Sequence, residues 1–269
     1  MPRYFIEVAY KGTHYSGFQI QQNANSVQAE IQKALKIFFK KDFELTGSSR
    51  TDAGVHALQN FFHFYVEPPL ITEKEIKILE SSKVFPVGGD LEGAAYNLNS
   101  ILPDDIVIKK IFLVKDFAHC RFDAISREYK YFIYQKKDPF LQDSAYYFPY
   151  KIDVDKLNEA AQQLLKYTDF TSFSKKNTQV NNFICKIEKS EWMIAENKLA
   201  YNVIANRFLR GMVKGLVGTM LKVGTNKISV NEFLKIIENK ESAKADFSVP
   251  PQGLFLVAVN FNPDIFIFH

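Results

Sequence analysis

One stretch of the chain constrains its surroundings more than any other, because it places a short polar loop between two strand patterns. Residues 47–57 have the sequence Gly-Ser-Ser-Arg-Thr-Asp-Ala-Gly-Val-His-Ala. Before it, Phe43 and Leu45 alternate with polar neighbours, and after it residues 61–66 are almost all aromatic or β-branched, which predicts strands on both sides. Gly54 allows a sharp turn just after Asp52, so that this carboxylate can project into a cleft. Composition alone favours a plainer alternative, a hairpin in which Asp52 caps a turn.

The hydrophobic pattern of the first half predicts a ferredoxin-like order of elements. Alternation predicts strands at residues 3–10 and 106–114, in addition to the two beside the loop. Helical spacing predicts a helix that ends at Phe39 and has Ser26 as its N-cap, a short helix at 73–80 and another at 92–102. The order strand, helix, two strands, helix, strand is typical of an antiparallel sheet with helices on one face.

The second half repeats this plan with longer insertions. Strands are predicted at residues 127–134, 187–194, 199–205 and 254–260, and helices at 154–165, 208–223 and 230–237. Residues 166–186 are irregular and carry several lysines, and a connection of that length is expected to be functional or mobile. The fold class predicted is therefore α+β. Two ferredoxin-like (RRM-like) halves, residues 1–115 and 116–269, share a continuous, mostly antiparallel sheet, with helices packed on one face and a cleft between the halves.

Two tyrosines of the second half are candidates for contact with a flat ligand. Tyr129 and Tyr131 lie two residues apart on a predicted strand and therefore face the same way. One of them could line a cleft and stack on a base. The alternative is that both are core aromatics whose hydroxyl groups are satisfied.

The segment 206–218 carries basic residues at helical spacing. At about 100° per residue, Arg207, Arg210 and Lys214 share one side of a predicted helix. That side borders a flank of three glycines, which allows another backbone or a ligand to come close. The alternative is a solvated basic face above an ordinary core helix.

Composition excludes several classes of protein. Hydrophobic residues make up 46% and charged residues 24% of the 269-residue chain, which indicates a globular protein. We find no apolar stretch of the roughly 18 to 20 residues that a membrane span needs, and no signal-peptide core at the start. Two cysteines and five scattered histidines give no zinc spacing, so we expect no metal and a reducing, cytoplasmic setting.

The charge of the chain permits nucleic acid as a partner without requiring it. The net charge is +4, and residues 1–115 carry 13 basic against 13 acidic side chains, whereas residues 116–269 carry 21 against 17. Binding to a phosphate backbone depends on local positive surface and not on a high total.

Residues 49–57 also resemble a family motif. Eight of the nine positions match the active-site stretch Gly-Arg-Thr-Asp-Ala-Gly-Val-His-Ala of the tRNA pseudouridine synthase A (TruA) family, and Ser49 replaces the first glycine. Further similar segments are residues 11–19, 102–106, 121–129, 212–218 and 252–259, so that the resemblance extends from residue 4 to about 261. Lys11 and Phe18 stand where the family usually has aspartate and tryptophan, and Lys214 where it has arginine. Residues 263–269 lie outside the resemblance.

The resemblance implies a function and a set of site residues. The expected enzyme isomerises uridine to pseudouridine in the anticodon stem-loop of tRNA, works as a homodimer, and uses no cofactor and no metal. Asp52 would be the catalytic residue, and Lys214 would pair with it. The other expected substrate-binding residues are Arg50, which replaces the extruded base or binds a phosphate, Tyr129, which stacks on the uracil, Arg121, Arg210 and Leu254, which walls the uracil pocket.

Two alternatives to this enzyme stay open. One is a relative that only holds or remodels tRNA, since Lys11, Phe18, Lys214 and the Cys185-Lys186 segment depart from the family pattern. In that case Asp52 would be dispensable. The other is an unrelated hydrolase with an aspartate nucleophile, but such enzymes normally bring a metal site or a positioned general base, and the sequence contains no such cluster.

Overall fold

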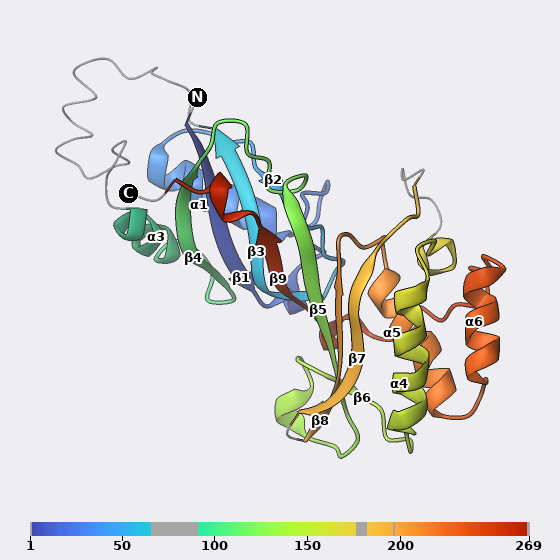
Figure 1. Cartoon of the computed structure of the whole chain (residues 1–269). Coiled ribbons are helices and arrows are strands. Elements are labelled where there is room, and N and C mark those ends of the chain that lie inside the picture. Colours follow the sequence, from blue (N-terminus) through green and yellow to red (C-terminus); the bar gives the residue numbers. More distant parts are fainter. Residues whose placement is uncertain (1, 66–90, 176–181, 196, 268–269) are drawn as a thin grey trace, which may run out of the picture. The chain divides into compact units, whose positions relative to one another are not determined.

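The computed structural model describes residues 2–65, 91–175, 182–195 and 197–267 (Figure 1). The helix predicted at 73–80 lies outside these ranges. Packing divides the chain into two compact units, one formed by residues 1–125 and 259–269 and the other by residues 126–258. Each unit is described by itself below. The predicted division at residues 115 and 116 rests on the repeat of the element order, and it stays a prediction.

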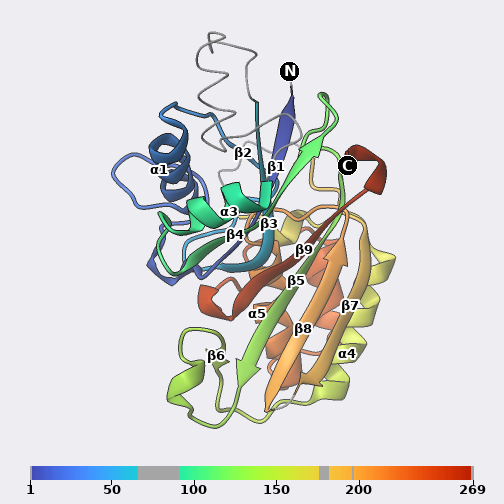
Figure 2. The same cartoon turned by 90° about the vertical axis from the view of Figure 1, so that its left-hand side faces the viewer.

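The first unit has the predicted order of elements. Strand β1 lies between β4 and β3, and β2 adds to the outer side of β3, with every pairing antiparallel. Helices α1 and α3 lie together on one face of these strands (Figure 2). The side chain of Ser26 caps α1 by accepting a hydrogen bond from Ala29 N–H, as the sequence predicted. The bounds are β1 Arg3–Tyr10, α1 Val27–Phe39, β2 Thr46–Gly47, β3 His56–Tyr65, α3 Leu91–Asn99 and β4 Ile106–Val114.

The strand predicted around Phe43 and Leu45 is wrong in extent, because β2 contains only Thr46 and Gly47. The carbonyl oxygen of Phe43 accepts a hydrogen bond from the Gln32 side chain at 2.6 Å, and that of Leu45 accepts one from Gln28 at 2.8 Å. Both glutamines belong to α1. These carbonyls are thus bonded to a helix and not to a neighbouring strand.

The second unit repeats the order of the first. Within it, β5 pairs antiparallel with β8, and β8 pairs with β7. Helices α4, α5 and α6 lie on one side of these strands (Figure 1). The bounds are β5 Ala124–Tyr134, β6 Tyr146–Tyr147, α4 Val154–Gln163, β7 Ile187–Ala195, β8 Lys198–Ala205, α5 Met212–Gly224, α6 Val230–Glu238 and β9 Leu254–Phe261.

Nine strands of the described residues form an open, mostly antiparallel sheet, which confirms the predicted α+β class. Strand β6 differs from the pairings given above, because it runs parallel to β5. None of the helices within the described ranges is long and apolar enough to cross a membrane. The predicted cleft between the halves stays a prediction.

The segment after β9, for which the sequence offered no account, packs against the core of the first unit. The Phe266 ring packs against the rings of Phe5, Phe112 and Phe261, with centroids 5.0 to 6.2 Å apart. Backbone hydrogen bonds from Lys115 to Ile265 and from Ile267 to Leu113 attach the segment to the end of β4. It therefore adds apolar cover and backbone partners at the outer strand of the unit.

Candidate active site

A buried hydrogen-bond network fixes the loop that carries Asp52. Asn60, on β3, is fully buried, and its side chain accepts hydrogen bonds from Ser48 Oγ at 2.7 Å and Phe61 N–H at 2.9 Å. Its amide group donates to Ser49 O at 3.0 Å and to Tyr10 Oη at 3.1 Å. Two of these hydrogen bonds join the loop residues Ser48 and Ser49 to β3, and the bond to Tyr10 joins β3 to β1, so that the segment before Asp52 is fixed to the sheet.

The segment after β1 forms further hydrogen bonds with the same loop. Phe18 N–H donates to Thr51 O at 3.1 Å, and Gly54 N–H donates to Tyr15 O at 3.4 Å. Gly12 N–H donates to His56 Nδ1 at 3.0 Å. A side chain at Gly12 would place its Cβ 2.0 Å from the carbonyl oxygen of Val55, so this close approach requires glycine.

The turn at Asp52 has the geometry that the sequence predicted. Gly54 adopts a left-handed conformation with φ 75°, which a residue with a side chain rarely adopts. Val55 N–H closes the turn by donating to the carbonyl oxygen of Asp52 at 3.2 Å. Thr51 is buried and its hydroxyl bonds Tyr10 Oη at 2.9 Å, whereas Asp52 is only half-buried. The arrangement presents one carboxylate at the surface of a rigid loop.

Phe18, which replaces the tryptophan usual in the family, is part of the core beneath this loop. Its side chain is 1% exposed and its ring stacks on Phe62 with centroids 4.5 Å apart. The ring also fills the space at Gly47, where a Cβ would lie 2.1 Å from it. The substitution is thus accommodated by packing.

Two arginines of the first unit lie near enough to influence each other. Burial, and next the charge of exposed Arg50, lower the pKa of the half-buried Arg121 guanidinium. Arg50 comes from the loop of Asp52 and Arg121 from the segment that precedes β5. Three of the predicted site residues, Arg50, Asp52 and Arg121, therefore belong to the first unit.

The other predicted site residues belong to the second unit. Tyr129, on β5, is buried and meets the Phe208 ring edge-on with centroids 5.0 Å apart. Tyr131 is fully buried, and its hydroxyl donates to Pro250 O at 2.7 Å, as the core alternative requires. Leu254 opens β9 and is buried.

The predicted basic face of a long helix is wrong in part, because α5 begins at Met212 and not near Phe208. Gly211 takes a left-handed conformation with φ 75°, which ends the preceding segment. The carbonyl oxygen of Arg210 accepts a hydrogen bond from Lys175 N–H at 3.0 Å. Arg207 and Arg210 therefore precede the helix, and Lys214, half-buried in its first turn, is the basic residue of the predicted set that α5 carries.

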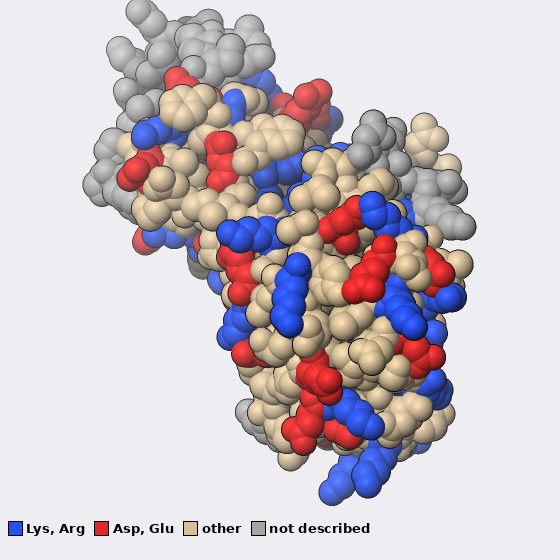
Figure 3. All heavy atoms as spheres, turned by 45° about the vertical axis from the view of Figure 1, so that its right-hand side comes forward, with Lys and Arg blue, Asp and Glu red and all other residues tan. Residues whose placement is uncertain are grey.

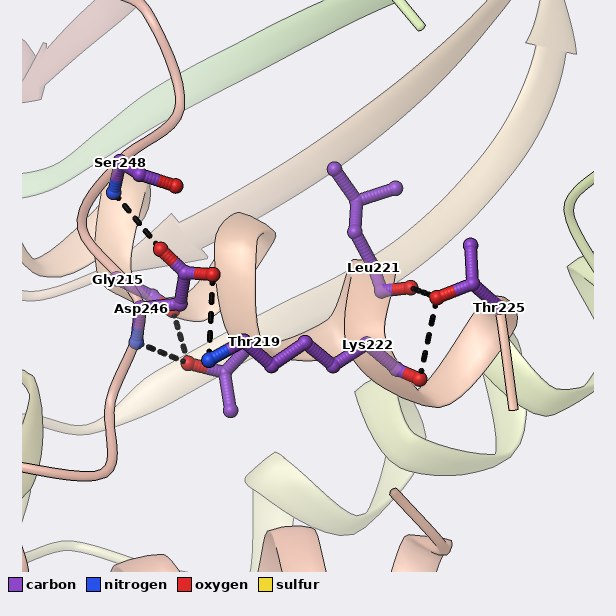
Figure 4. Close-up of polar contacts among 7 residues, drawn as sticks. All are labelled: Gly215, Thr219, Leu221, Lys222, Thr225, Asp246 and Ser248. Atoms are coloured by element: carbon purple, nitrogen blue, oxygen red, sulfur yellow. Dashed lines mark hydrogen bonds and ion pairs between the residues drawn. The ribbon is translucent and has the colours of Figure 1, made fainter. Parts of the chain in front are cut away.

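The glycine flank of α5 admits a neighbouring backbone, and that backbone belongs to the segment around Asp246 (Figure 4). Asp246 N–H donates to Thr219 Oγ1 at 2.9 Å, and the Thr219 hydroxyl donates to Gly215 O at 2.7 Å. A Cβ on Gly218 would lie 2.2 Å from the Asp246 carbonyl oxygen. Lys222 adds an ion pair to Asp246 at 3.3 Å. Gly215, next to Lys214, and Gly218, about one turn further along α5, thus serve packing within the second unit.

Basic and acidic side chains are interspersed on the face of the molecule shown in Figure 3. Several lysines of the second unit form ion pairs, among them Lys189 with Glu191 at 2.8 Å and Lys244 with Glu241 at 2.7 Å. Among the residues that the structure describes, no three His, Cys, Asp or Glu side chains are placed to hold a metal ion.

The sequence analysis missed Asn60 and Tyr10, which hold the loop without belonging to it. A signal was present for Asn60, since it is an amide residue that directly precedes the aromatic run of a predicted strand. A polar residue at such a position is normally fully hydrogen-bonded. Tyr10 carried no such signal, because an aromatic residue at a strand end is common.

An α+β framework of two ferredoxin-like repeats carries a loop with one rigidly presented carboxylate, an arrangement that can place a reacting group for catalysis. The family model described as tRNA pseudouridine synthase matches residues 6–86 and 160–262. Three relatives bear the name tRNA pseudouridine synthase A. The protein of Bacteroides fragilis is 45% identical, over 98% of both chains. That of Bacteroides thetaiotaomicron is 42% identical, over 99% of this chain and 93% of the relative. That of Staphylococcus aureus strain MRSA252 is 34% identical, over 94% and 90%. The chain belongs to the tRNA pseudouridine synthase A family, a family of isomerases.

Proposed function

We propose that this protein isomerises uridine to pseudouridine in the anticodon stem-loop of tRNA, with Asp52 as the catalytic carboxylate. Family membership supports the reaction and tRNA as the substrate. The observation that supports Asp52 is the loop itself. Hydrogen bonds from two neighbouring segments lock the residues on either side of it, whereas its own side chain is only half-buried. Rigid placement of a reacting group is what such a reaction needs.

The reaction rearranges one molecule without a redox partner. The N1–C1′ bond of the uridine breaks, the base turns, a C5–C1′ bond forms, and the proton leaves C5 while N1 ends as N–H. An ionised carboxylate close to the sugar or base assists at the step where the glycosidic bond breaks. No cofactor is needed for this balance, and none is proposed.

The remaining site residues receive their roles from the chemistry of a flipped nucleotide. Arg50, exposed beside Asp52, fills the space of the extruded base or binds a phosphate. Tyr129 stacks on the uracil and Leu254 walls its pocket. Lys214 keeps the Asp52 carboxylate charged when the substrate excludes water. Arg121 and Arg210 contact the RNA backbone.

The test is turnover of an unmodified tRNA transcript, with pseudouridine mapped by chemical labelling and primer extension. Asp52→Asn keeps the size of the side chain but removes the carboxylate, so we expect pseudouridine formation to be lost while tRNA binding and thermal stability stay near wild type. Asp104→Asn, an exposed carboxylate of the same unit, is the matched control and should be fully active. Turnover by Asp52→Asn close to wild type would favour the relative that only binds or remodels tRNA.

We further propose that the protein works as a homodimer in the cytoplasm. One subunit of 31.0 kDa with a net charge of +4 offers a small platform for an L-shaped RNA, and two copies double the available positive surface. Light scattering at assay concentration should give the mass of two chains. A fully active monomer would contradict this part of the proposal.

A further inference from the structure

The first unit presents an exposed aromatic ring beside one of its arginines. Phe122 is 76% exposed, although burial of an aromatic ring is favourable. It follows Arg121 directly in the chain. A single exposed aromatic residue is common, so the ring is of interest only if its neighbours fix its position.

Phe122 is held in place by a braced turn. His119 Nδ1 accepts hydrogen bonds from Arg121 N–H at 3.2 Å and Phe122 N–H at 3.3 Å. Asp123 closes the turn, because its carboxylate accepts from His119 N–H at 2.7 Å and its own N–H donates to His119 O at 3.0 Å. The exposed ring is therefore carried on a fixed backbone.

A column of rings supports Phe122 from behind. Its ring lies on His119 with centroids 4.2 Å apart and planes 33° apart, and His119 meets His63 at 4.5 Å. His63 is buried and contacts Cys120 Sγ at 3.2 Å, and its ring meets Tyr65, over which the Arg3 guanidinium lies 4.0 Å from the centroid. One face of the Phe122 ring is thus backed, and the ring is held ready for a ligand.

The ligand that fits this arrangement is an unpaired base joined to a phosphate. Aromatic rings bind unpaired bases by stacking, and arginines beside them bind the backbone. Arg121 lies within the same turn, and the charge of Arg50, two residues before Asp52, contributes after burial to a lowered pKa of its guanidinium. The ring and the loop of Asp52 belong to the same unit.

We propose that Phe122, backed by His119, is a stacking platform for an unpaired nucleotide of the tRNA near the target uridine. This inference rests on the proposed function for the position of the target. The platform positions RNA and takes no part in bond breaking. Its loss should therefore weaken binding and raise KM, and should leave kcat near wild type.

The experiment compares three substitutions at Phe122 in the full-length protein. Stacking of one base corresponds to roughly a 5- to 150-fold change in affinity, so Phe122→Ala should raise Kd and KM for an unmodified tRNA transcript by that factor. Phe122→Trp should keep wild-type affinity. Phe122→Leu, which keeps apolar bulk but loses the ring face, should behave like alanine. Phe140→Ala removes a 92% exposed ring of the other unit and should change Kd less than twofold.

Binding is measured by fluorescence anisotropy in the Asp52→Asn background, which separates this inference from catalysis. If Asp52 is not the catalytic residue, Asp52→Asn will still turn over tRNA, but the Kd differences among the Phe122 variants will be the same. The inference is overturned if Phe122→Ala binds tRNA as wild type does, or if Phe122→Leu keeps full affinity. It is also overturned if sedimentation shows that Phe122→Ala loses affinity only by dissociating two copies of the chain, since the ring would then belong to a protein interface.

Discussion

Replacing Asn60 by alanine should loosen the loop of Asp52 from a distance. The substitution removes a side chain that makes four hydrogen bonds. Two of the four partners keep another bond, because Tyr10 Oη still bonds Thr51 and Phe61 N–H still reaches Ser48 Oγ at 3.3 Å. The Ser49 carbonyl loses its donor and the Ser48 hydroxyl loses its acceptor.

The expected cost follows chiefly from the Ser49 carbonyl, because the Ser48 hydroxyl still accepts the hydrogen bond from Phe61 N–H. A buried polar group that loses its partner costs about 1–3 kcal/mol, so the free energy of unfolding of the first unit should fall by at least about 1–3 kcal/mol. That is a large share of the roughly 5–15 kcal/mol that stabilises a typical domain. At urea concentrations where Asn60→Ala is still folded, the loop of Asp52 should move relative to β1. A misplacement of about 1 Å can lower turnover on the order of 10²-fold.

The assay combines urea unfolding, followed by circular dichroism, with amide exchange at Ser48 and Phe61. The one tryptophan, Trp192, lies in the other unit and cannot follow this loop by fluorescence. Asn202→Ala is the matched control, since Asn202 is also a buried strand asparagine, but its Oδ1 has no hydrogen-bond partner among the described residues. Its loss should cost less. If Asn60→Ala costs no more than Asn202→Ala and keeps wild-type turnover, the network does not hold the loop.

Three further predictions concern single side chains. Lys214→Met should lose about 2–4 kcal/mol of transition-state stabilisation, whereas Lys214→Arg should keep most activity. Normal turnover by Lys214→Met in a single-turnover assay would show that Lys214 is not part of the site. Ser49→Ala removes a buried hydroxyl that has no hydrogen-bond partner among the described residues, so it should leave stability unchanged or raise it by up to about 1 kcal/mol in urea melts, and a clear loss would mean that the hydroxyl is satisfied. Burial, then His119, Arg3 and Arg121, lower the pKa of His63 to about 3. Between about pH 6.5 and pH 3, His63 therefore binds a proton in the unfolded chain but stays neutral in the folded chain. The free energy of unfolding should decrease as the pH is lowered through this range, by up to about 1.4 kcal/mol per pH unit. His63→Gln should show a shallower slope in that window, and an equal slope would contradict the assignment.

The order of elements could be predicted from the sequence because it depends on local periodicity. Alternation over residues 3–10 and helical spacing after Ser26 each act within one element, and both are confirmed. The prediction was wrong where a contact from elsewhere decides the outcome. Phe43 and Leu45 alternate as a strand would, yet glutamine side chains of α1 bond their carbonyl oxygens.

The start of α5 shows the same limit at a single glycine. The apolar spacing of Phe208 and Leu209 continues the helical pattern, so the sequence predicts an earlier start. Gly211 breaks the pattern with a left-handed φ, whereas Gly215 and Gly218 remain helical. Nothing in the sequence separates these glycines. What separates them is the neighbour that each one faces, the Lys175 side chain in one case and Phe247 and Asp246 in the others.

The candidate site was predictable where its residues are close together in the sequence, as Arg50 and Asp52 are. The residues that hold the loop in place are distant in the sequence and were not predictable. Tyr10 meets Thr51, and Gly12 meets His56, across about forty residues of sequence in each case. Local patterns cannot specify such pairs. The network around Asn60 therefore became visible only with the fold.

The departures from the family pattern divide into two kinds when their neighbours are considered. Phe18 and Ser49 lie in the first unit and are buried, and Phe18 fits a space that Gly47 leaves open, so this substitution is balanced by packing beneath the loop. A change balanced in this way leaves the position of Asp52 as it was. Lys214 is different, because it is half-buried at the start of a helix whose glycine flank is already occupied by Asp246 and Phe247. Its change from a planar guanidinium to a compact ammonium alters the geometry of any hydrogen bond that it makes. Of Phe18, Ser49 and Lys214, the departure expected to alter the substrate preference of this enzyme is therefore Lys214.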